Sequence, residues 1–143
     1  MQLALSEARN AATVGEVPIG AVVYTADGTV LAKAHNQPQA MADATAHAEL
    51  LAARGALAMR MPATPYLDDC YIAVTLEPCA MCAQALSWLR VKAIYFGAYD
   101  VKSGGVENGA QVLKHAHHKP EVIGGLCEVE CAELMKDFFA KRR

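Results

Sequence analysis

Two short motifs constrain the fold of this chain more than any other feature, because their side chains form a site only if distant segments meet. The first motif is Thr45-Ala46-His47-Ala48-Glu49, and the second is Glu77-Pro78-Cys79-Ala80-Met81-Cys82. One imidazole and two thiolates are three of the four ligands that a tetrahedral zinc ion takes, and the fourth position is then left for water. The sequence therefore predicts a zinc site of the catalytic type, formed by His47, Cys79 and Cys82.

The spacing inside each motif predicts that both lie at the start of a helix. Residues i and i+2 of a helix interior point about 200° apart, so His47 and Glu49 can serve one metal only at a helix N-terminus. Thr45 is the expected N-cap of that helix. Pro78 suits the first position of a second helix. The two thiols of the second motif are spaced i and i+3, so they would lie on one face of its first turn. The positive ends of two helix dipoles would favour thiolates at such a site.

The combination of His-x-Glu with Pro-Cys-x-x-Cys resembles the signature of the zinc nucleobase deaminases. The wider string from Val74 to Cys82 is similar in particular to the bacterial tRNA adenosine deaminases. The resemblance extends over nearly the whole chain and includes residues 16–21, Asn36-x-Pro38, residues 43–49, residues 95–104, Glu130-Cys131 and Asp137-Phe138-Phe139. Gln37 and Tyr99 depart from the pattern, because many members of the family carry arginine at the first of these positions and some carry arginine at the second.

The resemblance implies a zinc-dependent hydrolase that converts adenosine to inosine at the first anticodon (wobble) position of tRNA. One zinc ion per chain would be held by His47, Cys79 and Cys82 and would activate a water for attack on C6 of adenine. Glu49 is not a ligand in this scheme. It would carry protons from the water to the ring and onward to the leaving amine, so that ammonia departs.

Substrate contacts and partners are also implied by the resemblance. Asn36 is expected to bind the base, because an amide can both donate and accept hydrogen bonds. Asp100 and Lys102 are expected to contact RNA outside the pocket. The expected partners are a tRNA anticodon stem-loop and a second copy of the chain in a homodimer. The helix that carries Trp88 is a candidate interface element, although a single tryptophan is more often a core residue.

Two other functions remain open at this point. The first is a deaminase of free guanine or cytosine on the same scaffold, because pocket shape and contacts to the base edge decide which base is accepted. The second is a zinc-binding interaction module without catalysis. Glu49 argues against the module, since a structural zinc site has no need of an uncoordinated carboxylate. Ammonia release from adenine, cytosine or guanine compounds would separate these functions.

The hydrophobic pattern predicts one α/β domain over residues 1–143. Helices are expected at 3–13, 47–55, 79–89 and 128–139, with a short helix at 110–116, and strands at 19–24, 30–34, 71–76, 92–97 and 122–126. The Asp27-Gly28 turn predicts an antiparallel hairpin, whereas strand 71–76, its following helix and strand 92–97 predict a right-handed parallel unit. The expected architecture is a three-layer α/β/α, cytidine-deaminase-like domain. Its mixed sheet would have about five strands, with the metal at their C-terminal ends.

Net charge limits how this chain could bind nucleic acid. The 143 residues carry a formal net charge of −2, and the sequence pI is about 6.2. Such a balance argues against bulk electrostatic attraction to RNA, so any contact must come from local basic patches. The candidate patches are Lys102, Lys114, Lys119 and the terminal run Lys141, Arg142 and Arg143.

The remaining cysteines and histidines are assigned to structural positions. Cys70, Cys127 and Cys131 are predicted to be small buried hydrophobes rather than ligands. His115, His117 and His118 are predicted to lie in a solvated loop before Pro120. The chain has an odd total of five cysteines, and two assigned thiolates fit a reducing cytoplasm. The N-terminal segment carries Glu7 and lacks a continuous apolar run, so neither a secretory signal nor a membrane span is expected.

Overall fold

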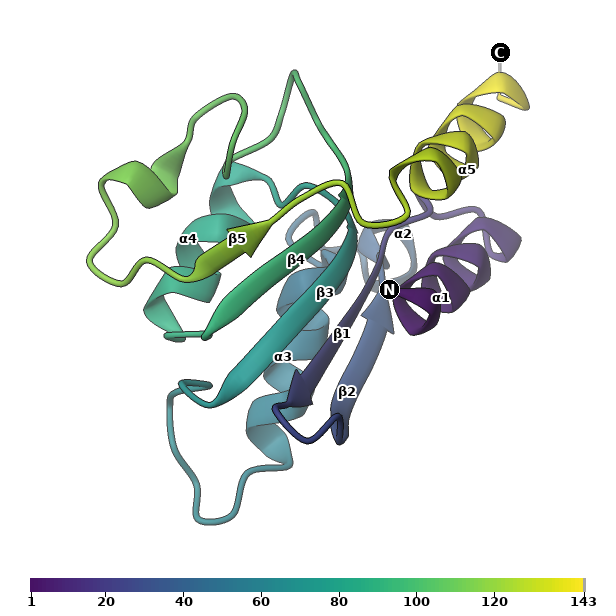
Figure 1. The fold of residues 1–143 in the computed structure, drawn as a ribbon. Coiled ribbons are helices and arrows are strands. Elements are labelled where there is room, and N and C mark those ends of the chain that lie inside the picture. The colour runs from purple at the N-terminus through teal and green to yellow at the C-terminus, as the bar shows by residue number, and fades with distance from the viewer. Residues whose placement is uncertain (143) are drawn as a thin grey trace.

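A five-stranded mixed sheet forms the centre of the computed structural model, which describes residues 1–142 (Figure 1). The strands are β1 (Gly20–Thr25), β2 (Val30–His35), β3 (Cys70–Leu76), β4 (Ala93–Ala98) and β5 (Glu121–Ile123), in the order β2-β1-β3-β4-β5. Strand β1 pairs antiparallel with β2 and β3, whereas β3 with β4 and β4 with β5 are parallel. The predicted mixed sheet, with its hairpin and its parallel unit, is confirmed.

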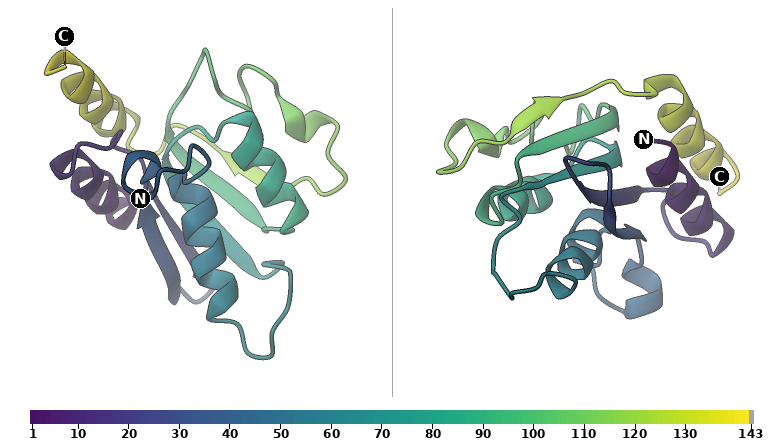
Figure 2. Two further views of the ribbon diagram at one scale, coloured as in Figure 1. Left: turned by 180° about the vertical axis from the view of Figure 1, so that it is seen from behind. Right: turned by 60° about the horizontal axis from the view of Figure 1, so that its bottom comes forward.

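The helices lie in two layers, one on each face of the sheet. They are α1 (Gln2–Thr13), α2 (Pro38–Met41), α3 (Ala48–Ala58), α4 (Ala80–Trp88) and α5 (Glu128–Ala140), with a 3-10 helix η1 at Val112–Lys114. Helices α3 and α4 cover one face, and α1 and α5 lie side by side on the other, near the C-terminal ends of β3 and β4 (Figure 2). The expected three-layer α/β/α architecture is therefore confirmed. Within residues 1–142, each helix is too short or too polar to span a lipid bilayer.

The main core lies between the sheet and the pair α3 and α4. Alternate residues of the central strands point into it, among them Ile72, Val74, Ile94 and Phe96, all fully buried. The helices contribute mainly alanine to this core, at positions 48, 52, 53, 56 and 83. Small side chains let α3 pack close to β1 and β2, and the N-termini of α3 and α4 lie at the same end of the central strands.

Two glycines allow α1 and α5 to approach the opposite face. A Cβ atom at Gly20 would overlap the carbonyl oxygen of Ala4 in α1, and one at Gly97 would overlap the sulfur of Cys131 in α5. Arg9 of α1 also forms an ion pair with Glu130 of α5. The two helices are thus held against the sheet and against one another.

The structure differs from the sequence-based expectations in several connecting segments. Residues 38–41, which lie outside the helices and strands predicted from the sequence, form helix α2, because the buried carboxylate of Glu16 accepts hydrogen bonds from the backbone N–H groups of Gln39 (2.9 Å) and Ala40 (2.8 Å). Helix α3 continues past Gly55 to Ala58. This glycine does not end the helix, because it packs against Ala32 of β2 within the helix interior.

Two further elements near the C-terminus are shorter than expected. The helix predicted over 110–116 is reduced to the single turn of η1. The strand predicted over 122–126 ends at Ile123, because Gly124 packs against the ring of Phe96 and Gly125 adopts a φ of +83° that turns the chain. These changes leave the sheet order unaffected.

Candidate metal centre and active site

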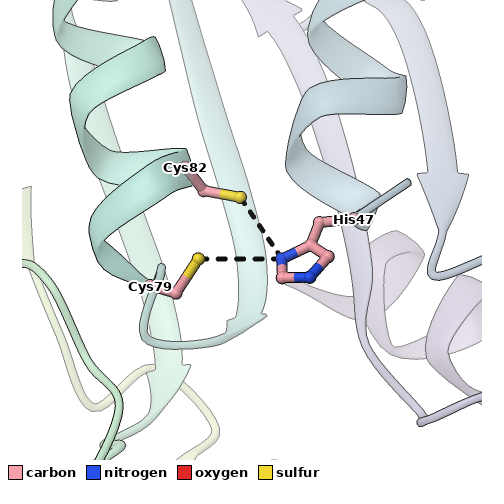
Figure 3. Close-up of side chains that lie close together, drawn as sticks. All are labelled: His47, Cys79 and Cys82. Carbon is pink, nitrogen blue, oxygen red and sulfur yellow. Dashed lines mark hydrogen bonds between the residues drawn. The ribbon is translucent and has the colours of Figure 1, made fainter. Parts of the chain in front are cut away.

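The two sequence motifs meet where the N-termini of α3 and α4 face each other (Figure 3). His47 is itself the N-cap of α3, and Cys79 is the N-cap of α4, both with extended backbone. The prediction that Thr45 caps the first helix was wrong, because its amide and hydroxyl both bond the carboxylate of Asp43. Pro78 was expected at the first helical position, but it precedes the N-cap and Ala80 is the first helical residue.

Three potential metal ligands converge at this point. The Nδ1 atom of His47 lies 3.5 Å from the sulfur of Cys82 and 3.7 Å from the sulfur of Cys79. In a tetrahedral zinc site with ordinary bond lengths, a ligating nitrogen and sulfur lie about 3.6 Å apart. The three donor atoms all lie within 4.8 Å of one another. Their geometry and their chemistry therefore fit a zinc ion.

The electrostatics of the cluster favour thiolate character at Cys79, whereas the hydrogen bond with Cys79 and burial raise the pKa of Cys82. A hydrogen bond with Cys82 and a second one with His47 outweigh burial and lower the pKa of Cys79 to about 4. The pKa of His47 is raised by the same contact with Cys79. Thiolates are the form in which cysteine binds metals, so Cys79 is prepared as a ligand before any ion arrives.

Glu49 lies in the first turn of α3, beside the three donors. Its side chain is 4% exposed, and its Oε2 atom is the one buried side-chain oxygen or nitrogen in residues 1–142 without a hydrogen-bond partner. Burial raises the pKa of this carboxyl to about 7. An unpartnered buried oxygen is costly in free energy and marks a place where a water or ligand is expected.

Asn36 directly follows β2, and its side chain is hydrogen bonded to the first residue of α3. Its Oδ1 atom accepts a hydrogen bond of 2.8 Å from the backbone N–H of Ala48, the residue between His47 and Glu49. The side chain is 5% exposed. Because the oxygen is engaged by Ala48, the amide NH2 is the part of this side chain that remains available as a hydrogen-bond donor.

Asp100 and Lys102 lie outside the donor cluster, in the loop that follows β4. The Asp100 carboxylate accepts hydrogen bonds from the backbone N–H groups of Lys102 (3.1 Å) and Ser103 (2.9 Å), which closes a tight turn. This turn and helix α5 form the two sides of a groove of about 820 Å³. The groove is lined by Leu76, Tyr99, Val101, Ala132, Met135, Lys136 and Phe139, together with the turn residues.

One functional candidate was not assigned from the sequence. Glu77 was quoted only as part of the second motif, yet its carboxylate is buried and accepts five hydrogen bonds from Asp100, Val106, Glu107 and Asn108. An acidic residue directly after an apolar strand and before Pro78 was the available signal. Its partners could not be named because they lie in an irregular loop far along the chain.

The other cysteines and histidines stay away from the donor cluster. Cys70 and Cys131 are buried, as predicted, but Cys127 is exposed. Cys127 occupies the N-cap of α5 with a positive φ of 56°, which turns it to the surface. His118 is also not simply solvated, because its ring contacts the carbonyl of Val91 at 2.8 Å.

Comparison with known proteins places this site in a family. Residues 1–98 match the family model described as the cytidine and deoxycytidylate deaminase zinc-binding region. The tRNA-specific adenosine deaminase of Agrobacterium fabrum is 44% identical over 146 aligned residues, which cover 100% of this chain and 93% of the relative.

Solved structures show the same fold. A tRNA:A34 deaminase, studied for A-to-I editing at the wobble position of transfer RNA, superposes with a TM-score of 0.89 at 44% identity. The match covers 94% of this chain and 96% of that one. Guanine deaminase from Nitrosomonas europaea has a TM-score of 0.84 at 21% identity over 97% of this chain and 82% of its own, which shows a common fold alone. The chain therefore belongs to the cytidine and deoxycytidylate deaminase family, in the branch of the tRNA-specific adenosine deaminases that match it along its whole length.

Proposed function

We propose that this protein hydrolyses adenosine to inosine at the first anticodon position of tRNA. The observation that carries the chemistry is the buried, unpartnered Oε2 atom of Glu49 beside the donor cluster of His47, Cys79 and Cys82. The substrate is supported by the full-length likeness to proteins named as tRNA-specific adenosine deaminases. We further propose that residues 1–143 form one deaminase domain acting in the cytoplasm.

The chemistry assigns a separate task to each group. One zinc ion per chain, held by His47, Cys79 and Cys82, would supply a water whose pKa is lowered to about 7. Glu49 takes a proton from the attacking water and delivers it to the adenine ring. It then takes the remaining proton of the hydroxyl added to C6 and passes it to the amine, so that the C–N bond breaks, ammonia departs and the carbonyl of inosine forms. A carboxyl group whose pKa is about 7 can both accept and release a proton at neutral pH.

The test of this function is conversion of a synthetic anticodon stem-loop that carries adenosine at its first anticodon position. Digestion to nucleosides and mass spectrometry should show inosine in place of that adenosine. A stem-loop of the same composition, with the adenosine moved elsewhere in the loop, is the matched control and should stay unconverted. Equal conversion of both would show a deaminase without the proposed site preference.

Asn36 provides a prediction about base recognition. Replacing it with aspartate retains an oxygen for the N–H of Ala48 but removes the NH2 donor, so kcat/KM should fall by about 10 to 100-fold, the loss expected for a buried hydrogen bond. In Asn36→Ala, kcat/KM should fall at least as far, because this substitution also removes the hydrogen bond to Ala48. Zinc content should stay at the wild-type level in both variants. Unchanged catalytic efficiency in Asn36→Ala would refute the assigned role.

Asp100, Lys102 and the groove beside them are proposed to hold RNA outside the pocket. The groove has an apolar wall of Met135 and Phe139, and exposed Lys102 lies at its edge. Unstacked bases bind such aromatic and apolar surfaces while cations contact the phosphates. The terminal basic run is a second candidate, although Arg143 lies outside the described residues. In the same run, Arg142 stacks on Phe138 at 4.1 Å from the ring centroid.

Lys102→Ala is expected to weaken stem-loop binding and to reduce its dependence on salt. Each lost phosphate contact lowers the slope of log K against log salt by about 0.7 for a single strand. Lys92→Ala is the matched control, because Lys92 is exposed directly before β4, at the end of this strand opposite to Lys102. Fluorescence anisotropy over a salt series measures both slopes. Equal slopes for Lys102→Ala and the wild type would contradict the contact.

A homodimer is the proposed assembly, with the outer face of α4 as its interface. Trp88 is 71% exposed and Met81 is 37% exposed, and their spacing of seven residues places them on the same side of the helix. A large exposed tryptophan next to a second apolar side chain is typical of an interface.

Sedimentation should therefore give twice the 15.2 kDa chain mass for the wild type at micromolar concentration. Trp88→Glu should shift the protein toward the monomer, because a charge on this face opposes its burial against a second copy. Val14→Glu is the control substitution, at an exposed apolar residue after α1. A wild-type protein that sediments as a single 15.2 kDa species would contradict the dimer.

A further inference from the structure

Glu77 is a buried carboxylate that connects two segments of the active-site region. It follows β3 directly and is 2% exposed, and within residues 1–142 no cationic side chain forms an ion pair with it. Its Oε1 atom accepts hydrogen bonds from the backbone N–H groups of Val106 (3.3 Å), Glu107 (2.8 Å) and Asn108 (2.8 Å). Its Oε2 atom accepts from the N–H of Asp100 (3.1 Å) and from Nδ2 of Asn108 (2.7 Å).

These donors belong to both ends of one irregular segment, residues 100–108, called here the 100–108 loop. The loop contains no helix or strand that would provide hydrogen-bond partners for its backbone N–H groups. The Glu77 carboxylate therefore serves as a common acceptor for Asp100 at the start and for Val106, Glu107 and Asn108 at the end. Buried polar groups must be paired, so this network fixes the shape of the loop.

The same loop packs directly on the turn that carries Cys79. The N–H of Gly105 donates a hydrogen bond of 2.8 Å to the carbonyl of Pro78, and Gly104 forms an isolated β-bridge with Cys79. A Cβ atom at Gly104 would lie 2.6 Å from Oε1 of Glu77. Any larger residue at this position would therefore clash with the carboxylate. The residues between the two ends, including Lys102 and Ser103, are left to form the wall of the groove.

We infer that Glu77 is a positioning residue for RNA: its carboxylate holds the 100–108 loop in place and so fixes the groove wall that carries Asp100 and Lys102. The inference rests on the proposed function, because that function identifies RNA as the occupant of the groove. Glu77 itself touches neither the base nor the donor cluster in this account. Its substitution should therefore alter substrate affinity more than turnover.

Glu77→Gln is the main test, because the side chain keeps its size while one acceptor becomes a donor. The amide nitrogen would then face the N–H of Asp100 and the Nδ2 of Asn108, and both pairings would be lost. KM for the stem-loop is expected to rise about tenfold, while kcat and zinc content change less than about twofold. Amide hydrogen exchange at Val106, Glu107 and Asn108, measured by NMR on the zinc-loaded protein, should become faster.

A reciprocal exchange separates positioning from a general loss of stability. Asn108→Asp alone brings two carboxylates together where the wild type has a 2.7 Å hydrogen bond, so KM should rise at least as much as in Glu77→Gln. In the double variant, Glu77→Gln with Asn108→Asp, the amide at position 77 can donate to the carboxylate at position 108. KM should then return to within about threefold of the wild type.

Several outcomes would overturn the inference. One is an unchanged KM in Glu77→Gln. Another is a fall in kcat and zinc content at constant KM, which would place the action of Glu77 on Cys79. Absence of rescue in the double variant would also count against it. Failure of the proposed function would instead appear in the wild type itself, as absence of stem-loop turnover, whereas failure of this inference alone appears only in the variants of an active enzyme.

Discussion

Replacing Glu49 with alanine is expected to lower kcat for deamination by at least about 10³-fold while the zinc content stays unchanged. General acid–base catalysis contributes about 10²–10⁴-fold, and here one carboxyl group handles protons in more than one step. The position supports this size of effect, because Glu49 is 4% exposed, its Oε2 atom has no partner in residues 1–142, and burial raises its pKa to about 7.

Single-turnover kinetics and metal analysis on the same preparation measure both quantities for Glu49→Ala. Glu49→Gln is the matched variant, since it keeps the shape of the side chain but cannot carry the proton, and it should lose a similar factor. Near-normal turnover in zinc-loaded Glu49→Ala would contradict the proposal that Glu49 transfers protons during deamination. Loss of zinc along with activity would instead indicate that Glu49 is a ligand.

Replacing Cys82 with alanine should abolish both zinc binding and turnover. Cys82 is buried, and its sulfur lies 3.5 Å from Nδ1 of His47, the shorter of the two sulfur contacts of that imidazole. Two remaining protein ligands are too few for a stable zinc site of this type. Metal content should fall to less than about a tenth of the wild-type value, and activity should fall to background.

Cys127→Ala is the control for Cys82→Ala, because it removes an exposed thiol at the start of α5. It should retain zinc and activity. Chelation of the wild type should reproduce the Cys82→Ala phenotype, and added zinc should reverse it in the wild type but not in the variant. Full activity of Cys82→Ala without zinc would exclude the His47, Cys79 and Cys82 site as the catalytic centre.

The features predicted correctly from sequence are those set by local spacing. The positions of His47, Glu49, Cys79 and Cys82 around two helix starts, and the strands on either side of α4, follow from patterns within a few residues. The sequence has a buried strand, a helix and a second buried strand in succession, and this pattern predicts a right-handed parallel unit. Such a unit places the second motif at the C-terminal end of β3.

The features that were missed depend on contacts between residues distant in the chain. Helix α2 exists because Glu16 accepts hydrogen bonds from its first backbone amides, and nothing in residues 38–41 shows this. The pairing of Asn36 with Ala48 and the network around Glu77 are of the same kind. Thr45 illustrates a local failure, because Asp43 competes successfully for the hydroxyl that could have capped α3.

The most direct test of the whole account is a deamination assay with tRNA beside free guanine and free cytosine, under the same conditions and with the zinc-loaded protein. Inosine at the first anticodon position, with guanine and cytosine unchanged, is the predicted result. The tRNA reaction should also slow as salt rises, because a protein of net charge −2 binds RNA through a few local cations. Turnover of guanine or cytosine without turnover of tRNA would leave the fold in place but contradict the proposed substrate.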